Sequence, residues 1–177
     1  KALDSVKGGL IGRPVSYVSS FTMTVSTPDN IRANPRESGG GTFYDIGVYC
    51  INAARHLFRA EPIEVFAMTT GRKGSIEETA AATLRFPGDR LATFCVSFGA
   101  DKTSEYRVTG TKGSLRVDPG YEIAAGLKLH VTRGGKKQTC PFRWRPPMYG
   151  SPESYPGGCG SGSLTMTRGG NALPFTR

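Results

Sequence analysis

A series of short strand-like segments, separated by turns rich in glycine and proline, constrains the fold of this chain most strongly. Six such runs are Ile63–Thr70, Thr79–Phe86, Leu91–Phe98, Tyr106–Thr109, Ser114–Val117 and Leu127–Thr132. Tight turns are predicted at Pro87-Gly88-Asp89, at residues 110–113 and at Gly134-Gly135. Because consecutive strands joined by tight turns pair antiparallel, the runs predict one large, predominantly antiparallel sheet.

An earlier strand is predicted at Val15–Ser26, where apolar and polar residues alternate. Helix patterns occupy residues 1–10 and 42–58. Six strands span about 30 Å, whereas one helix is about 10 Å wide, so two helices cannot cover both faces of the sheet. We therefore expect an α+β fold with helices on one face and the other face open. The open face is predicted to carry Ser16, Ser20, Thr22, Thr24, Thr83, Thr93, Cys95 and Ser97.

Three glycines, residues 39–41, precede the second helix pattern and give the backbone the freedom to approach a ligand closely. Thr42 followed by Asp45 predicts a capping box at the helix start. Asp45 and Tyr49 are four residues apart, so they share one helix face. Asn52 and His56 extend the same row, with a solvated helix face as the alternative interpretation.

The segment Gly39–Phe58, continued by residues 61–65, resembles the C-terminal, substrate-side domain of the glucose–fructose oxidoreductase/inositol dehydrogenase (Gfo/Idh/MocA) family. Residues 27–32 resemble the segment before the glycines in the sugar and dihydrodiol dehydrogenase branch. Residues 106–115 resemble a hairpin of the family. The resemblance covers roughly residues 1–142.

The resemblance implies a sugar, polyol or cyclic diol as substrate and NAD or NADP as cofactor. It implies that Asp45 holds the substrate and that Tyr49 exchanges a proton with the reacting oxygen. Arg32 and Asn52 are predicted to orient the substrate. Gly40 and Gly41 are predicted to lie at the edge of the cofactor site. The family also assembles through the open sheet face, which predicts a homo-oligomer.

The sequence shows no dinucleotide-binding fingerprint, which would be a glycine motif between a strand and a helix. Gly8-Gly9-Leu10-Ile11-Gly12 follows a helix pattern instead. The family's Glu-Lys-Pro segment has no counterpart either. No amino-acid side chain carries a hydride. We therefore expect that this chain alone neither binds the cofactor nor turns over substrate.

Four cysteines, Cys50, Cys95, Cys140 and Cys159, are widely separated, which predicts buried free thiols in a reducing, cytoplasmic compartment. With two histidines and no close cysteine pair, no metal site is expected. The net charge of +9 raises the possibility of nucleic-acid binding. The basic residues sit mainly on predicted turns, so neither a nucleic-acid nor a membrane partner is expected.

Residues 143–177 contain 7 glycines and 5 prolines and no periodic apolar face. Such a segment buries too little surface to offset its ordering entropy. We expect a substrate-binding and oligomerisation domain over residues 1–142 and an irregular tail over 143–177. The tail is either flexible or the product of a changed reading frame.

Two functions remain open at this stage. The first is the substrate-binding and oligomerising domain of an NAD(P)-dependent oxidoreductase, inactive without its cofactor half. The second is a non-catalytic sugar-binding or subunit-assembly module. NAD(P)H binding to the chain alone would separate the two, because it would show that a cofactor site is present.

Overall fold

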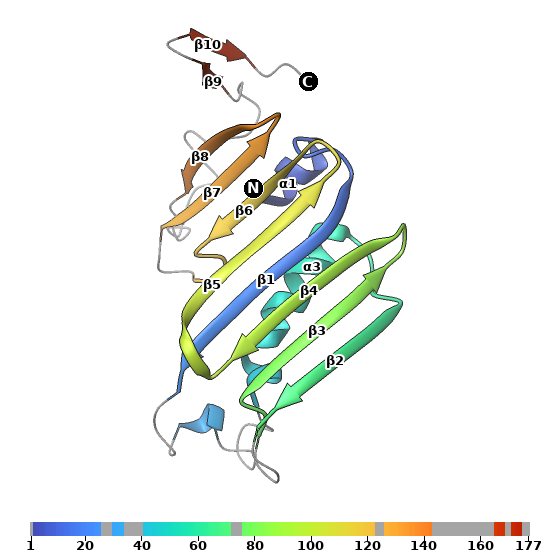
Figure 1. The fold of residues 1–177 in the computed structure, drawn as a ribbon, viewed down its shortest axis with the longest axis vertical. Helices are drawn as coiled ribbons and strands as arrows, with labels where there is room; N and C mark the ends of the chain where they lie inside the picture. The colour runs from blue at the N-terminus through green and yellow to red at the C-terminus, as the bar shows by residue number, and fades with distance from the viewer. Residues whose placement is uncertain are drawn as a thin grey trace, which may run out of the picture.

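A computed structural model describes residues 2–25, 30–33, 41–71, 76–122, 126–142, 165–168 and 171–174. Eight strands form one sheet (Figure 1): β1 (Pro14–Thr24), β2 (Glu64–Thr70), β3 (Thr79–Phe86), β4 (Arg90–Ser97), β5 (Gly99–Gly110), β6 (Gly113–Asp118), β7 (Leu127–Arg133) and β8 (Lys136–Phe142). The helical elements are α1 (Ala2–Lys7), the 3-10 turn η1 (Ile31–Ala33), the π-helical turn η2 (Phe43–Gly47) and α3 (Val48–Phe58).

The strand order is β2-β3-β4-β1-β5-β6-β7-β8. The first strand in the chain therefore lies in the middle of the sheet. It pairs parallel with β4 and antiparallel with β5. All other neighbours are antiparallel. The predicted α+β class with a large, predominantly antiparallel sheet is confirmed.

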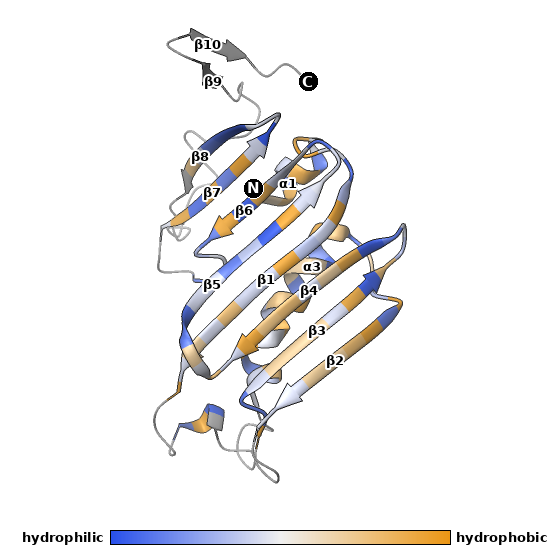
Figure 2. Cartoon of the chain, in the orientation of Figure 1, coloured by the Kyte–Doolittle hydropathy of each residue, from blue (hydrophilic) through white to orange (hydrophobic). Residues whose placement is uncertain are grey.

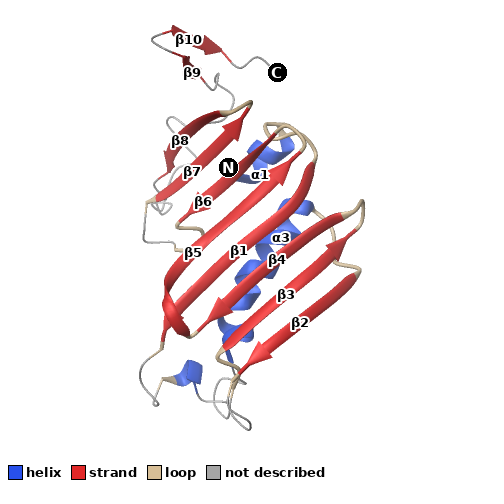
Figure 3. Ribbon diagram, in the orientation of Figure 1, coloured by secondary structure: helices blue, strands red, loops and turns tan. Residues whose placement is uncertain are grey.

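Both α1 and α3 lie behind the same face of the sheet in the view of Figure 3. The core forms between these helices and the apolar residues of the strands. Tyr17, Phe94 and Val108 of the sheet and Cys50 and Ala54 of α3 are almost completely buried. Alternation along each strand brings these side chains to one face, so the helix-covered face was predictable from the period-two pattern.

The opposite face is largely open, as predicted, and Thr93 and Cys95 are exposed on it. Thr22 and Ser97 are corrections, because both are buried. The register between β1 and β5 shifts at residues 22–24, and the first residues of β5 contact both buried side chains. The Thr22 hydroxyl donates a hydrogen bond to the carbonyl of Asp101, and the Gly99 amide donates one to Ser97 Oγ at 3.1 Å.

The open face is also more apolar than expected. Its exposed apolar side chains are Val18, Phe66, Met68 and Leu91. The pairing register aligns Phe66, Thr83, Thr93 and Val18 in one row across four strands. Hydrophobic colours dominate β2 to β4, whereas β8 is mostly hydrophilic (Figure 2).

The predicted turns are confirmed, including Gly134-Gly135, where both φ angles are positive as a two-residue hairpin requires. The strand β8 on its far side was not predicted. The eight-stranded sheet ends at Phe142, but residues 143–164 lie outside the described residues, so the boundary at 142 stays a prediction. Beyond it, β9 (Thr165–Arg168) and β10 (Asn171–Pro174) pair as an unpredicted two-stranded hairpin.

The cysteine prediction is partly wrong. Cys50 is a buried free thiol, as expected, but the free thiol of Cys95 is exposed because its strand position faces the open side of the sheet. Cys140 is disulfide-bonded. Its partner lies outside the described residues.

Candidate functional site

The helix that carries the predicted site begins at Gly41, which lies against the carboxylate of Glu77, a residue distant in sequence. Gly41 has a φ of +87°, and a Cβ atom at this position would overlap with the carboxylate of Glu77. Glu77 Oε1 accepts a hydrogen bond from the Phe43 amide at 2.9 Å. A glycine is therefore required here by a close approach within the chain itself. Gly40 lies outside the described residues, and the cofactor role of both glycines stays a prediction.

The predicted capping box is wrong. Thr42 has helical φ and ψ angles and makes no capping hydrogen bond. Its buried hydroxyl lies 2.9 Å from the carbonyl oxygens of Glu77 and Glu78 instead. Glu77 caps the helix start from the strand side, and Thr42 ties the same turn to the sheet.

Asp45 lies in the π-helical turn η2 and pairs with Arg32 of η1. Arg32 Nε lies 2.8 Å from Asp45 Oδ2, with the side chains 50% and 33% exposed. The structure thus brings together two of the four side chains predicted to bind or convert a substrate. Both side chains of the pair are therefore partly exposed to solvent.

Tyr49 stands one turn further along, in the first turn of α3. Its side chain is 52% exposed. Its ring packs edge-on against Phe21 at 6.0 Å between centroids and lies 6.4 Å from the ring of Tyr121. The rings of Phe21 and Tyr121 therefore pack against the Tyr49 ring, and about half of the Tyr49 side chain stays accessible to solvent.

A buried polar cluster lies behind Tyr49. The Tyr121 hydroxyl lies 2.6 Å from the Tyr17 hydroxyl and 2.5 Å from Ser19 Oγ. Ser19 Oγ also lies 2.9 Å from the Glu105 carbonyl and 3.4 Å from Cys50 Sγ. Burial raises the pKa values of the Tyr17 and Tyr121 phenols and of the Cys50 thiol. These groups thus stay protonated near neutral pH and act as hydrogen-bonding supports.

Three supporting residues of the site, Glu77, Ser19 and Tyr121, were not predicted from the sequence. Ser19 gave a usable signal, because the alternation in β1 places it on the apolar face between Tyr17 and Phe21. A serine at such a position requires a buried hydrogen-bond partner. Tyr121 follows the last residue of β6 by three positions and had no pattern of its own.

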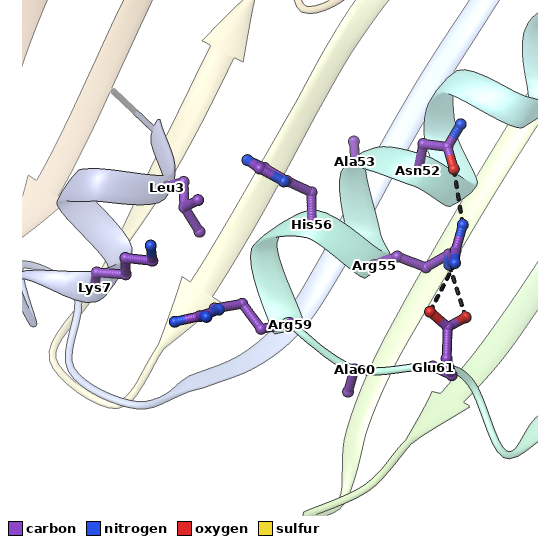
Figure 4. A pocket seen from close by; sticks show the side chains of 9 residues that line it. All are labelled: Leu3, Lys7, Asn52, Ala53, Arg55, His56, Arg59, Ala60 and Glu61. Atoms are coloured by element: carbon purple, nitrogen blue, oxygen red, sulfur yellow. Dashed lines mark hydrogen bonds and ion pairs between the residues drawn. The ribbon is translucent and has the colours of Figure 1, made fainter.

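Asn52 is separated from the Arg32–Asp45 pair and lines a different feature. Its Oδ1 accepts a hydrogen bond from Arg55 at 3.1 Å, and Arg55 also binds Glu61 through two hydrogen bonds of 2.7 Å. The feature is an open groove of about 1000 Å³ between α1 and α3 (Figure 4). Its lining residues are Leu3, Lys7, Asn52, Ala53, Arg55, His56, Arg59, Ala60 and Glu61.

The doubly wound dinucleotide-binding fold has a mostly parallel sheet and holds the cofactor at the carboxyl ends of its strands. Within the described part of the chain, parallel pairing is limited to β1 and β4. The described residues therefore do not form that fold. They also contain no group of three or more His, Cys, Asp or Glu side chains arranged to hold a metal ion.

The first 116 residues match the family model described as the GFO/IDH/MocA C-terminal domain. This is more than half of the chain. The chain belongs to the GFO/IDH/MocA family. The resemblance drawn from the glycines and the following helix is thereby confirmed.

Several curated proteins that match the chain are named as sugar or diol dehydrogenases. A D-xylose 1-dehydrogenase [NADP(+)] of Haloarcula marismortui is 32% identical over 129 residues, 68% of this chain and 36% of the enzyme. A trans-1,2-dihydrobenzene-1,2-diol dehydrogenase of Danio rerio is 33% identical over 87 residues, 49% of this chain and 26% of the enzyme. The chain spans about a third of the length of its first curated relatives.

The same relationship holds in three dimensions. The aldose-aldose oxidoreductase of Caulobacter crescentus, solved with glycerol, superposes with a TM-score of 0.75 at 29% identity. The superposition covers 82% of this chain and 44% of that protein. The sheet and its helices are thus a domain shape found within larger family members.

None of the helices in the described ranges reaches the length and apolarity needed to cross a membrane. The longer one, α3, has 11 residues.

Proposed function

We propose that this chain supplies the substrate-binding half of an NAD(P)-dependent oxidoreductase that acts on a sugar, a polyol or a cyclic diol. Family membership and the named activities of its relatives support the reaction class. One observation carries the site: the solvent-accessible Arg32–Asp45 pair stands one helical turn before the half-exposed phenol of Tyr49.

Each side chain has a distinct role in this proposal. The Asp45 carboxylate accepts hydrogen bonds from substrate hydroxyls, and the ion pair with Arg32 orients it. The Tyr49 phenol donates a hydrogen bond or a proton to the reacting oxygen. Asn52 orients a more distant hydroxyl once it exchanges its hydrogen bond from Arg55 for one to the substrate.

The hydride comes from the nicotinamide cofactor, for which the described residues offer no parallel-sheet site. We therefore propose that the chain is inactive alone and that Gly40 and Gly41 face the cofactor only from the edge. We also propose a cytoplasmic location for the chain. The free thiols of Cys50 and Cys95 support this location, whereas the disulfide of Cys140 favours an oxidising compartment.

Ligand-observed NMR tests the site directly, using D-xylose and glycerol with the full chain. Asp45→Asn is expected to weaken sugar binding about ten-fold and Tyr49→Phe about five-fold, as expected for charged and neutral hydrogen bonds. Tyr44→Phe is the matched control, because Tyr44 is a 73% exposed tyrosine in the same helix start. Equal losses in Tyr44→Phe and Tyr49→Phe would contradict the assignment.

Titration of the chain with NADPH, monitored by nicotinamide fluorescence, tests the proposal that this chain alone does not bind the cofactor. No change in emission is expected. Tight binding of NADPH would overturn the claim that the cofactor half lies outside this chain. The alternative is a non-catalytic sugar-binding or subunit-assembly module, and the absence of a dinucleotide fold from the described residues supports it. An assembly module predicts self-association without any sugar binding.

We also propose that the open sheet face joins two copies of the chain. Phe66 and Met68, 68% and 66% exposed, form an apolar patch with Val18 and Leu91 on this face. The double variant Phe66→Ser, Met68→Ser is expected to elute as a monomer and the unmodified chain as a dimer or larger, by light scattering. Val65→Ser is the control, since Val65 is exposed on the other face of the same strand.

A further inference from the structure

The groove between α1 and the second half of α3 lies apart from Asp45, Tyr49 and Arg32, which do not line it. Asn52 is the one residue that it shares with the proposed substrate site. It lies between two helices that contact each other, and its apolar lining residues are Leu3, Ala53 and Ala60. Its polar lining side chains are those of Lys7, Asn52, Arg55, His56, Arg59 and Glu61.

The charges in the groove are divided between two sides. On one side, the guanidinium of Arg55 is neutralised by the bidentate bond to Glu61. On the other side, Lys7, His56 and Arg59 extend toward the same space between the helices (Figure 4). Within the described residues, none of these three side chains has a hydrogen bond or an ion pair.

Helix dipoles account for part of this arrangement but not for all of it. Lys7 ends α1, and Arg59 follows the last residue of α3, so each cation is favoured singly by a helix C-terminus. The dipoles do not explain why two cations from different helices share one groove with a histidine. Mutual repulsion of Lys7 and Arg59 is relieved when an anion lies between them.

We propose that this groove binds a phosphate-type oxyanion carried by a small molecule. The guanidinium of Arg59, the ammonium of Lys7 and a ring nitrogen of His56 supply the donors that tetrahedral oxyanions accept. Because the groove is open and its cations are exposed, each contact is weak, and the affinity comes from their sum. The proposal does not depend on the substrate site at Asp45 and Tyr49.

Amide NMR shifts of the full chain test the proposal, with inorganic phosphate titrated against sodium chloride at constant ionic strength. Saturable shifts at Lys7, His56 and Arg59 are expected with phosphate and not with chloride. A sugar phosphate and a nucleotide then distinguish the carrier, since the true carrier binds more tightly than free phosphate. Shifts that are equal for phosphate and chloride, or that avoid the groove, would overturn the proposal.

Two variants are expected to weaken binding, a third to tighten it, and a fourth serves as the control. Lys7→Gln and Arg59→Gln are each expected to weaken phosphate binding about three- to five-fold. Glu61→Gln frees Arg55 and is expected to tighten binding by a similar factor, a gain that misfolding cannot imitate. Arg107→Gln is the control for Lys7→Gln and Arg59→Gln, because it also removes one positive charge but lies on the open face of the sheet. It is expected to leave phosphate binding unchanged. If Glu61→Gln fails to tighten binding while the chain stays folded, the proposal is wrong.

Discussion

The two faces of the sheet are built from the same strands and differ in what closes them. On the helix-covered face, Tyr17, Ser19 and Phe21 of β1 are buried. On the open face of the same strand, Val18 is 56% exposed and the Ser20 hydroxyl meets Thr103 at an exposed position. Every buried side-chain polar atom in the described ranges has a hydrogen-bond partner. The comparison teaches that the helices bury the sheet where they cover it, whereas the open face leaves apolar side chains such as Val18 and Phe66 exposed.

The largest expected effect separates two neighbouring residues of β4. Phe94 is 1% exposed on the helix face, and Thr93 is exposed on the open face. Phe94→Ala should lower the free energy of unfolding by about 3–5 kcal/mol because it leaves a cavity in the core. Thr93→Ala should change it by less than about 0.5 kcal/mol. Urea denaturation measures both, and a large loss in Thr93→Ala would show that the open face is covered in solution.

A smaller effect is expected where the helix start meets the sheet. Gly41→Ala should cost about 2 kcal/mol, because the alanine adopts a positive φ and displaces the Glu77 carboxylate from the Phe43 amide. Gly88→Ala is the control, since Gly88 also has a positive φ but an open surrounding, and it should cost about half as much. If Glu77→Ala lowers the free energy of unfolding as much in the Gly41→Ala variant as in the unmodified chain, the two residues are not coupled and this explanation is wrong.

A third comparison tests the buried polar cluster. Ser19→Ala removes a hydroxyl that links Tyr121, Cys50 and the Glu105 carbonyl, and should cost about 1–2 kcal/mol. Ser20→Ala removes an exposed hydroxyl from the opposite face and should cost less than about 0.5 kcal/mol. Equal losses in thermal unfolding would contradict the distinction between the faces.

The smallest effect appears at high pH. Burial raises the pKa of Tyr106 to about 12, so the folded state prefers the neutral phenol. The unfolded chain releases this proton near pH 10, so the stabilisation is complete below pH 10 and is lost as the pH rises toward 12. At pH 10.5, Tyr106 should account for about 0.8 kcal/mol of the loss. Tyr106→Phe should therefore reduce the pH dependence of urea midpoints above pH 10 and leave it unchanged at pH 7.

The fold was largely predictable because its signals are local. The period-two pattern of β1 and the glycine turns specify which side chains face the helices. β8 was missed because Lys136–Phe142 is mostly polar and contains Pro141, as is common for an edge strand. The capping box failed because a threonine and an acidic residue at the right spacing do not fix the backbone of the helix start.

The site was less predictable because its supports are distant in sequence. Asp45 and Tyr49 were selected from their spacing, and Arg32 only from a resemblance. The contact from Phe43 to Glu77 spans 34 residues, and the contact from Ser19 to Tyr121 spans 102. No local pattern encodes such pairs, so a single sequence cannot identify them. The catalytic roles of Asp45 and Tyr49 remain predictions.

The central position of β1 makes the order of synthesis important. The ribosome produces this strand first among the eight, yet Ser19 must wait for Glu105, 86 residues later, before its hydrogen bond can form. A nascent chain interrupted before β5 would therefore leave β1 as an edge strand beside β4, with its other side unpaired. An interruption after β7 would remove the edge strand β8 and the separate β9–β10 hairpin, and no other strand of the described residues. Early truncations should thus abolish folding, whereas late ones should leave the surroundings of Asp45 and Tyr49 intact.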